Sequence, residues 1–372
     1  MQEKTRDIQI DILRIIAMFM IILFHCFNNT NIIERGIMSD VNGIIAMFLR
    51  VVTNVANGIF FIISGYYLIH KKFKLKHILT LWGKTILFST LAVVIACFLQ
   101  LPVKIEQATF PIIAGEYWFI TAYIILYLIY PFYNLVLNRL TKKQMQYLLG
   151  ILFGVVSVLN IIFHYNVFFG NFAVVLLYYA IGTYIQKYYI PKEKEYPMAK
   201  FFIIALVATI LYLFVFALRM EDVENSYLKL FVNNLYSDFF NLKNPFSVLM
   251  AFFLFIAFYK KAIKKPIIQK FTTWITPSIL SVYLIHENTN LNIYWLFLGI
   301  NDLASSLWCI PYILFVTLMV FIICLIIDGI RRISYTFLKK IPIVNSGTKK
   351  LNDKLEKYND KITNILYSEE SK

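Results

Sequence analysis

The chain has 372 residues, 59% of them are hydrophobic, and the mean hydropathy is +0.67. A water-soluble protein of this size cannot hide so much apolar surface, so the composition excludes a soluble globular protein and predicts one embedded in lipid. The formal net charge of +15 comes from lysine and arginine clusters between apolar segments. None of these clusters lies in a soluble domain, so we interpret the charge as a topology signal and not as nucleic-acid binding.

About ten apolar stretches are long enough to cross a ~30 Å hydrocarbon core as helices. They lie at residues 10–29, 44–69, 78–101, 117–137, 146–163, 167–186, 200–218, 245–259, 276–298 and 307–328. Runs this long and uniformly apolar exclude barrel strands, so the predicted fold class is an all-α polytopic membrane protein. Basic residues gather at alternate ends of the spans, which places both termini in the cytoplasm. We therefore expect a membrane domain at 1–330 and a cytoplasmic basic amphipathic tail at 331–372.

The first span carries two unusual side chains, Arg14 and His25, eleven positions apart. On an α-helix this separation is three turns plus about 20°, so both point to one side, roughly 16 Å apart along the axis. Asp7 and Asp11 share this seam. Ionisable groups in a span cost at least ~2.5–3.5 kcal/mol each and usually mark a functional interior face. Cys26 points about 100° away from His25, so we expect it to be an ordinary apolar residue.

The second span has a polar stripe that includes Arg50, Asn54, Asn57 and Ser64. A buried arginine needs an anionic partner, so we assign Arg50, Asn54 and Asn57 to substrate binding. Ser64 and Gly65 lie near the predicted cytoplasmic end. Small residues there allow either close packing of another helix or the passage of a thin ligand.

Two further groups of polar residues lie in or beside later spans. Glu116 precedes Trp118 at the outer end of the fourth span, where a tryptophan often belongs to the interfacial belt and an acid can orient a histidine or bind a sugar hydroxyl. His286 and Glu287 are adjacent inside the ninth span. Side chains of this kind are not expected to face lipid, and they either pair structurally or take part in catalysis.

These motifs together resemble the family-3 integral-membrane acyltransferases. Arg14 and His25, preceded by the stretch from Arg6 to Asp11, resemble the first-helix signature of that family. The segment FFIISGY, at 60–66, is similar to the FFxxSGY motif, and the pieces at 118–119 and 283–286 resemble later family motifs. The matches occur in the family's order and extend over most of the chain.

The chain also departs from the family pattern at two places. It has Asn57-Gly58 where the family often has a proline, and Lys76 and Lys84 where the third helix often begins with arginines. The extracytoplasmic esterase-like domain of some relatives is absent from the sequence. This absence favours a stand-alone polysaccharide or glycan O-acetyltransferase.

The resemblance implies transfer of an acyl group, usually acetyl, from cytoplasmic acyl-CoA to a hydroxyl of a cell-surface polysaccharide or a lipid-linked glycan. The essential pair of the family is then Arg14 and His25. His25 acts either as general base on the acceptor hydroxyl or through a transient acyl-histidine. We expect Glu116, His286 and Glu287 to be its catalytic partners.

For the donor acetyl-CoA, we expect lysine side chains to hold the phosphates as point charges and the pantetheine arm to pass Ser64 and Gly65. The candidate lysines are Lys71, Lys72, Lys74, Lys76 and Lys84. Arg14 is expected at the pyrophosphate or the pantetheine neck, and Trp118 at the acceptor. The cysteines lack metal-ligand spacing, so no metal is predicted.

The expected partners are acyl-CoA, the glycan acceptor and membrane lipids, with a homodimer left open. The isoleucine-, asparagine- and lysine-rich composition is typical of AT-rich bacterial genomes, which suggests a bacterial plasma membrane. The alternative function is a glycan-precursor transporter or flippase without acyl transfer. A sensor or scaffold without turnover is a third class, and it leaves Arg14, His25 and Arg50 without a purpose.

Overall fold

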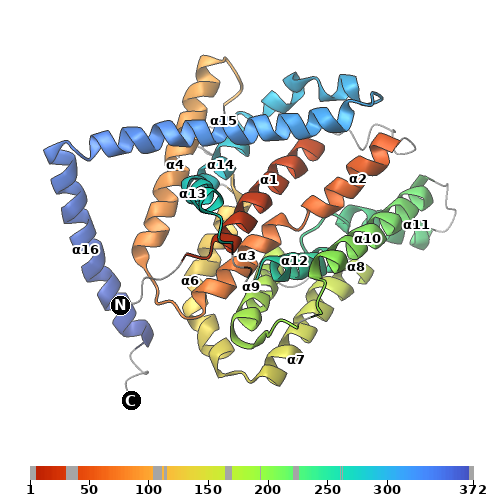
Figure 1. Cartoon of the computed structure of the whole chain (residues 1–372), viewed down its shortest axis with the longest axis horizontal. Helices are drawn as coiled ribbons and strands as arrows, with labels where there is room; N and C mark the ends of the chain where they lie inside the picture. Colours follow the sequence, from red (N-terminus) through yellow and green to blue (C-terminus); the bar gives the residue numbers. More distant parts are fainter. Residues whose placement is uncertain are drawn as a thin grey trace. The chain divides into compact units, whose positions relative to one another are not determined.

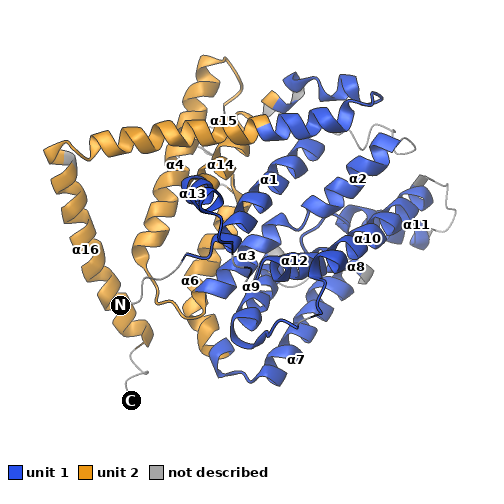
Figure 2. Cartoon of the chain, viewed as in Figure 1, with its two compact units in different colours: residues 1–67, 137–276, 295–318 blue, residues 68–136, 277–294, 319–372 orange. Residues whose placement is uncertain are grey.

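The computed structural model describes residues 6–30, 41–103, 111–112, 115–163, 170–192, 194–220, 226–259, 261 and 263–367. Within these ranges the regular structure consists of helices, with no strand (Figure 1). The predicted all-α class is therefore confirmed. The chain divides into two compact units, drawn in different colours in Figure 2. Unit 1 contains Met1–Tyr67, Leu137–Thr276 and Trp295–Leu318, and unit 2 contains Leu68–Val136, Pro277–Tyr294 and Met319–Lys372.

Unit 1 holds most of the helices in the described part of the chain. They are α1 (Ile8–Thr30), α2 (Val41–Thr53), α3 (Ala56–Leu68), α7 (Lys142–Leu152), the π-helix η1 (Phe153–Val158), α8 (Leu159–Phe163), α9 (Gly170–Tyr188), α10 (Pro197–Met220), α11 (Ser226–Asp238), α12 (Pro245–Phe258) and α13 (Pro266–Ile275). Local signals explain several starts: a capping box joins Thr141 and Gln144 at α7, and the Asn244 side chain caps α12 ahead of Pro245.

The helices of unit 2 come from three separate stretches of sequence. They are α4 (Leu75–Phe98), α6 (Trp118–Arg139), the short 3-10 helix η2 (Thr276–Ser278), α14 (Ile279–His286) and α16 (Pro342–Tyr367). Helix α15 (Cys309–Leu338) begins in unit 1 and ends in unit 2, and the 3-10 helices η3 (Asn292–Leu298) and η4 (Ile300–Leu303) precede it. Helix α15 continues to Leu338, so residue 330, the predicted end of the membrane domain, lies within this helix.

Seven segments of the described chain are long and apolar enough to cross a membrane. They are Ile8–Thr30, Val41–Leu68, Leu75–Phe98, Trp118–Arg139, Lys142–Ile161, Pro197–Arg219 and Cys309–Leu338. Helices α9 and α12 occupy the predicted spans at 167–186 and 245–259, and α12 is only 14 residues long. Several of these helices expose rows of large apolar side chains, as expected of surfaces that face lipid.

The ninth predicted span, at 276–298, is not one continuous helix. The helical stretch starts earlier, with Pro266 at the first turn of α13, and ends at His286. The sequence Glu-Asn-Thr-Asn that follows, at 287–290, forms turns instead, because short polar side chains compete for backbone hydrogen bonds. In the second span, a turn at Asn54 and Val55 separates α2 from α3.

Helices α3 and α9 cross very closely in unit 1, through one glycine on each side. A Cβ atom placed on Gly65 would lie 1.9 Å from the Tyr179 carbonyl oxygen, and one on Gly182 would lie 2.0 Å from the Ile62 carbonyl oxygen. The Thr183 hydroxyl also donates to the Gly65 carbonyl, at 3.4 Å. The small residue in the FFIISGY motif is therefore required for close helix packing, one of the two interpretations left open by the sequence.

The C-terminal helix α16 packs against α4 within unit 2. The Asn359 side chain accepts a hydrogen bond from the Leu75 backbone at 2.9 Å, and the Tyr367 hydroxyl accepts one from the Phe73 backbone at 3.2 Å. Lys74, the N-cap residue of α4, makes no side-chain cap hydrogen bond. The C-terminal helix therefore supplies caps that the start of α4 does not supply for itself.

We predict that Gly182→Ala destabilises the protein by about 1–3 kcal/mol, because the added methyl group must push α3 and α9 apart. The measurement is the thermal unfolding midpoint of the purified protein in detergent. Gly150→Ala in α7 is the matched control, since nothing lies within 4 Å of a Cβ atom there. Equal midpoints for Gly182→Ala and wild type would contradict the close crossing.

Candidate functional site

Arg14 is held by a charge network at the N-terminal end of α1, within unit 1. The Asp11 carboxylate lies between two arginines and accepts hydrogen bonds from Arg6 Nε and Arg14 Nη1. The Arg14 guanidinium lies 5.4 Å from the ring centroid of Tyr67, whose hydroxyl donates to Asp7 at 2.7 Å. The positive charges of two arginines are offset by the negative charges of two carboxylates. This network therefore lowers the cost of placing a charged arginine at the edge of a membrane span.

Arg14 is not sealed inside this network. Its side chain keeps 28% of its surface exposed, whereas the Asp11 side chain keeps 4%. A guanidinium has five N–H donors, and the contact with Asp11 uses Nη1. Arg14 is therefore both fixed in orientation and suited to bind a further anionic or carbonyl group.

His25 lies near the other end of α1 and is half-buried. Its ring meets the preceding Phe24 ring edge-on, with centroids 5.9 Å apart. The Arg50 guanidinium lies 5.9 Å from the Phe24 ring centroid and 4.0 Å from that of Phe240. These aromatic faces help to stabilise the Arg50 guanidinium and bring this cation to the aromatic neighbour of His25.

The other polar residues of the second span have local roles in unit 1. The buried Asn54 side chain donates to the Ser247 hydroxyl at 2.7 Å, which joins the turn between α2 and α3 to α12. The Ser64 hydroxyl donates to the Phe60 carbonyl at 2.8 Å. Asn57 is half-buried, and its side-chain oxygen has no hydrogen-bond partner in the described part of the chain. Among the described residues of the polar stripe, Asn57 thus offers a side-chain oxygen that can still accept a hydrogen bond.

The basic residues around the start of α4 are exposed to solvent. Lys71, Lys72, Lys74 and Lys76 are all exposed, and the Lys72 ammonium lies 5.8 Å from the ring centroid of Tyr367 on α16. Lys84 differs from them, because it is half-buried within α4.

Glu116 belongs to a polar network in unit 2 that sequence spacing did not reveal. Its carboxylate accepts hydrogen bonds from the Thr289 backbone at 2.8 Å and from the Thr289 hydroxyl at 2.9 and 3.0 Å. The neighbouring Tyr117 hydroxyl donates to the Leu284 carbonyl at 3.0 Å and accepts from Asn288 at 2.7 Å. Glu116 and Tyr117 thus fix the turn that follows α14. Trp118 is 37% exposed, which fits an interfacial residue.

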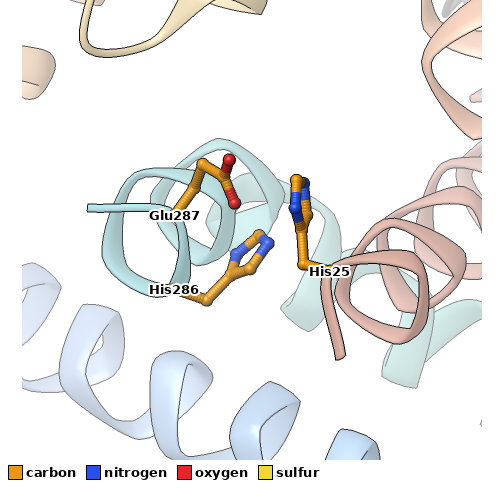
Figure 3. Close-up of side chains that lie close together, drawn as sticks. All are labelled: His25, His286 and Glu287. Carbon is orange, nitrogen blue, oxygen red and sulfur yellow. The ribbon is translucent and has the colours of Figure 1, made fainter. Parts of the chain in front are cut away.

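His286 and Glu287 lie at the C-terminal end of α14, also in unit 2, and Figure 3 labels them together with His25 of α1 in unit 1. His286 is 1% exposed, and its Nδ1 lies 2.7 Å from the Val282 carbonyl oxygen. Because a carbonyl oxygen can only accept, Nδ1 carries the hydrogen, and Nε2 is the basic nitrogen of the neutral ring. The helix backbone therefore fixes the tautomer of this histidine.

Sequence reasoning missed Tyr67, Tyr117 and Thr289, which hold the predicted residues in place. Tyr67 ends the FFIISGYY run, and Tyr117 stands between two candidates, so their positions beside motifs were available signals. Thr289 pairs with Glu116 over 173 positions of sequence, and no spacing rule predicts such a contact.

The family comparison agrees with the motifs carried by this geometry. Residues 7–329 match the acyltransferase domain. The chain belongs to acyltransferase family 3. No curated protein and no solved structure matches it significantly. The matched region contains Arg14, His25 and every other candidate residue, so the chain is a membrane acyltransferase.

We predict that Asp11→Asn destabilises this acyltransferase by about 3 kcal/mol, because it removes the countercharge of two arginines. Tyr67→Phe, which loses one hydrogen bond to Asp7, is expected to cost only about 1 kcal/mol. Thermal unfolding in detergent measures both. A smaller effect for Asp11→Asn than for Tyr67→Phe would show that the ion pairs do not stabilise α1.

Proposed function

We propose that the protein transfers an acetyl group from acetyl-CoA to a hydroxyl of a cell-surface polysaccharide or lipid-linked glycan. The observation that supports this most is the pairing on α1 of a charge-balanced, partly exposed arginine with a half-buried histidine eleven residues later. Roughly 16 Å of helix rise separates them. That distance suits a donor bound near one side of the membrane and a reaction nearer the other.

In the proposed reaction His25 acts as the general base. Its neutral imidazole accepts the proton of the acceptor hydroxyl while that oxygen attacks the thioester carbonyl of acetyl-CoA. The tetrahedral intermediate collapses with cleavage of the carbon–sulfur bond. The thiolate of CoA leaves and takes the proton from the imidazolium, so the products are the acetyl ester and free CoA thiol, with His25 neutral again.

A covalent route uses the same residue. A ring nitrogen of His25 attacks the thioester, CoA leaves as the thiol after proton transfer, and an acetyl-imidazole remains on the protein. The acceptor hydroxyl then attacks this acetyl group and restores the free imidazole. The two routes differ in whether the protein itself carries the acetyl group before the acceptor arrives.

The remaining residues are proposed for binding and support. The exposed lysines of the loop before α4 and the half-buried Lys84 bind the phosphates of the donor, with Arg14 as a further donor contact. Arg50, Asn54, Asn57 and Trp118 bind the glycan, where amide, cationic and indole groups suit sugar hydroxyls. Glu116, His286 and Glu287 are proposed as catalytic partners of the reaction.

We expect His25→Ala to keep expression and thermal stability but to lose acetyl transfer by a factor of about 10²–10⁴ or more, because the proton acceptor is gone. Purified protein with labelled acetyl-CoA and surface glycan gives the rate. His70→Ala is the matched control, since this exposed histidine lies in the loop after α3.

Two results would count against the proposal. Transfer by His25→Ala at the wild-type rate would remove His25 from the mechanism. Wild-type protein that moves a glycan precursor across vesicles without any acetyl transfer would favour the transporter alternative.

A rapid-quench experiment separates the two routes. Wild-type protein is mixed with labelled acetyl-CoA in the absence of acceptor, denatured and counted for bound label. On the covalent route label appears on wild type and is absent from His25→Ala. On the general-base route neither protein retains label, although wild type transfers it once glycan is added.

A further inference from the structure

Helix α6 binds backbone carbonyls of the basic loop, residues 69–74, which joins α3 to α4. The helix and the loop both belong to unit 2. Three α6 side chains supply hydrogen bonds of 2.9–3.5 Å: Asn134 donates to Leu68 and Ile69, Tyr130 to Lys71, and Tyr127 to Lys74. Positions 127, 130 and 134 are spaced by three and four, so they share one face of the helix. One face of α6 therefore fixes the path of the loop.

Helix α16, also in unit 2, binds backbone amides of the same loop and of the residue that follows it. The Asn359 side-chain oxygen accepts from the Leu75 amide at 2.9 Å, and the Tyr367 hydroxyl accepts from the Phe73 amide at 3.2 Å. The Phe73 side chain is buried, and its ring centroid lies 5.5 Å from that of Tyr127 on α6. The backbone of this short connection is thus bonded through its carbonyls to one helix and through its amides to another.

The basic side chains of the loop face solvent, whereas its backbone is held by the protein. Lys71, Lys72 and Lys74 are exposed on either side of the buried Phe73. Connections that lie on a surface are usually among the more mobile parts of a protein, and neighbouring cations repel one another. Side chains of two other helices hold this loop in one conformation instead. Its ammonium groups therefore start from a fixed backbone.

We propose that Asn359 and Tyr367 are positioning residues for the donor, and that they hold the basic loop so that its lysines meet the phosphates of CoA. The inference rests on the proposed function, in which these lysines bind the donor phosphates. Asn359 and Tyr367 contact the loop backbone and act only through it. A loop that is already ordered loses less conformational freedom when the ligand binds, so its affinity for the ligand is higher.

Both positioning residues lie beyond residues 7–329, the region that matches the family domain. Helix α16 is therefore an addition to that domain, and on this proposal it completes the donor site from outside. Tyr130 of α6 lies within the matched region and holds the same loop through the Lys71 carbonyl.

The test measures CoA binding by full-length protein in nanodiscs of phosphatidylcholine, with calorimetry as the readout. Pantetheine, which lacks the phosphates, is the comparison ligand. Hydrogen exchange over residues 68–75 reports, without any ligand, how firmly the loop backbone is held. The acetyl-transfer assay then gives KM for acetyl-CoA and kcat separately.

Asn359→Ala and Tyr367→Phe are the test variants, because each removes one acceptor, and Tyr367→Phe keeps the ring near Lys72. We expect faster exchange over 68–75 and CoA binding weakened by about three- to tenfold, the scale of one hydrogen bond, with pantetheine binding unchanged. KM for acetyl-CoA rises by the same factor, while kcat stays within about twofold. Asn359→Asp keeps an acceptor oxygen for the Leu75 amide and restores CoA binding.

Asn364→Ala and Tyr358→Phe are the matched controls, because they make the same chemical changes at exposed positions of the same helix. Both are expected to bind CoA as wild type does. Thermal melting checks that every variant is folded. If an α16 variant does not fold, Tyr130→Phe makes the same comparison from α6, since it removes the hydrogen bond to the Lys71 carbonyl.

Three results would overturn the inference. Wild-type affinity for CoA in the folded test variants would show that the fixed loop is purely structural, and the proposed function would stand. Equal losses of CoA and pantetheine binding would show a general loosening of the protein, which is not a phosphate effect. Wild-type protein that binds CoA no more tightly than pantetheine would remove the phosphate-binding role of the lysines, and this inference with it.

Discussion

A polar group on a membrane helix must find its partners within the protein, because the hydrocarbon core offers no hydrogen bonds and little screening of charge. Because of this constraint, several charged side chains on the helices are each positioned by a specific neighbouring acid or aromatic ring. Asp11 is placed between two arginines, the Arg50 guanidinium lies over Phe240, and Arg331 pairs with the buried Asp328. In each case a charge that function or topology requires is made tolerable by an acid or an aromatic face within reach.

Features that depend on local helical periodicity could be predicted from the sequence. The seam of Asp11, Arg14 and His25 on α1 follows from 3.6 residues per turn, and the structure shows the Asp11–Arg14 contact that this spacing allows. The long apolar runs likewise predicted the membrane helices. The break after His286 was missed because the polar turn at 287–290 is short and apolar sequence follows it. The mean hydropathy of the whole stretch therefore stays high.

Features that depend on contacts between distant segments could not be predicted in this way. Gly65 was open to two interpretations from the sequence, because the approach of the Tyr179 backbone on α9 is visible only in the fold. The contact of Glu116 with Thr289 likewise joins residues 173 positions apart. The contact of the Arg50 guanidinium with Phe240 also joins residues 190 positions apart, and no spacing rule predicts it. The candidate residues were therefore recognisable by type and motif, whereas their orientation depends on neighbours supplied by the fold.

The docking of α16 on α4 has a consequence for how the protein is made. The backbone donors of Phe73 and Leu75 bond to Tyr367 and Asn359 on α16, far along the sequence. During synthesis the start of α4 must therefore wait until partners 284 and 294 positions away along the chain have emerged from the ribosome. The basic loop that precedes α4 therefore reaches its final form only after α16 has been synthesised and has docked.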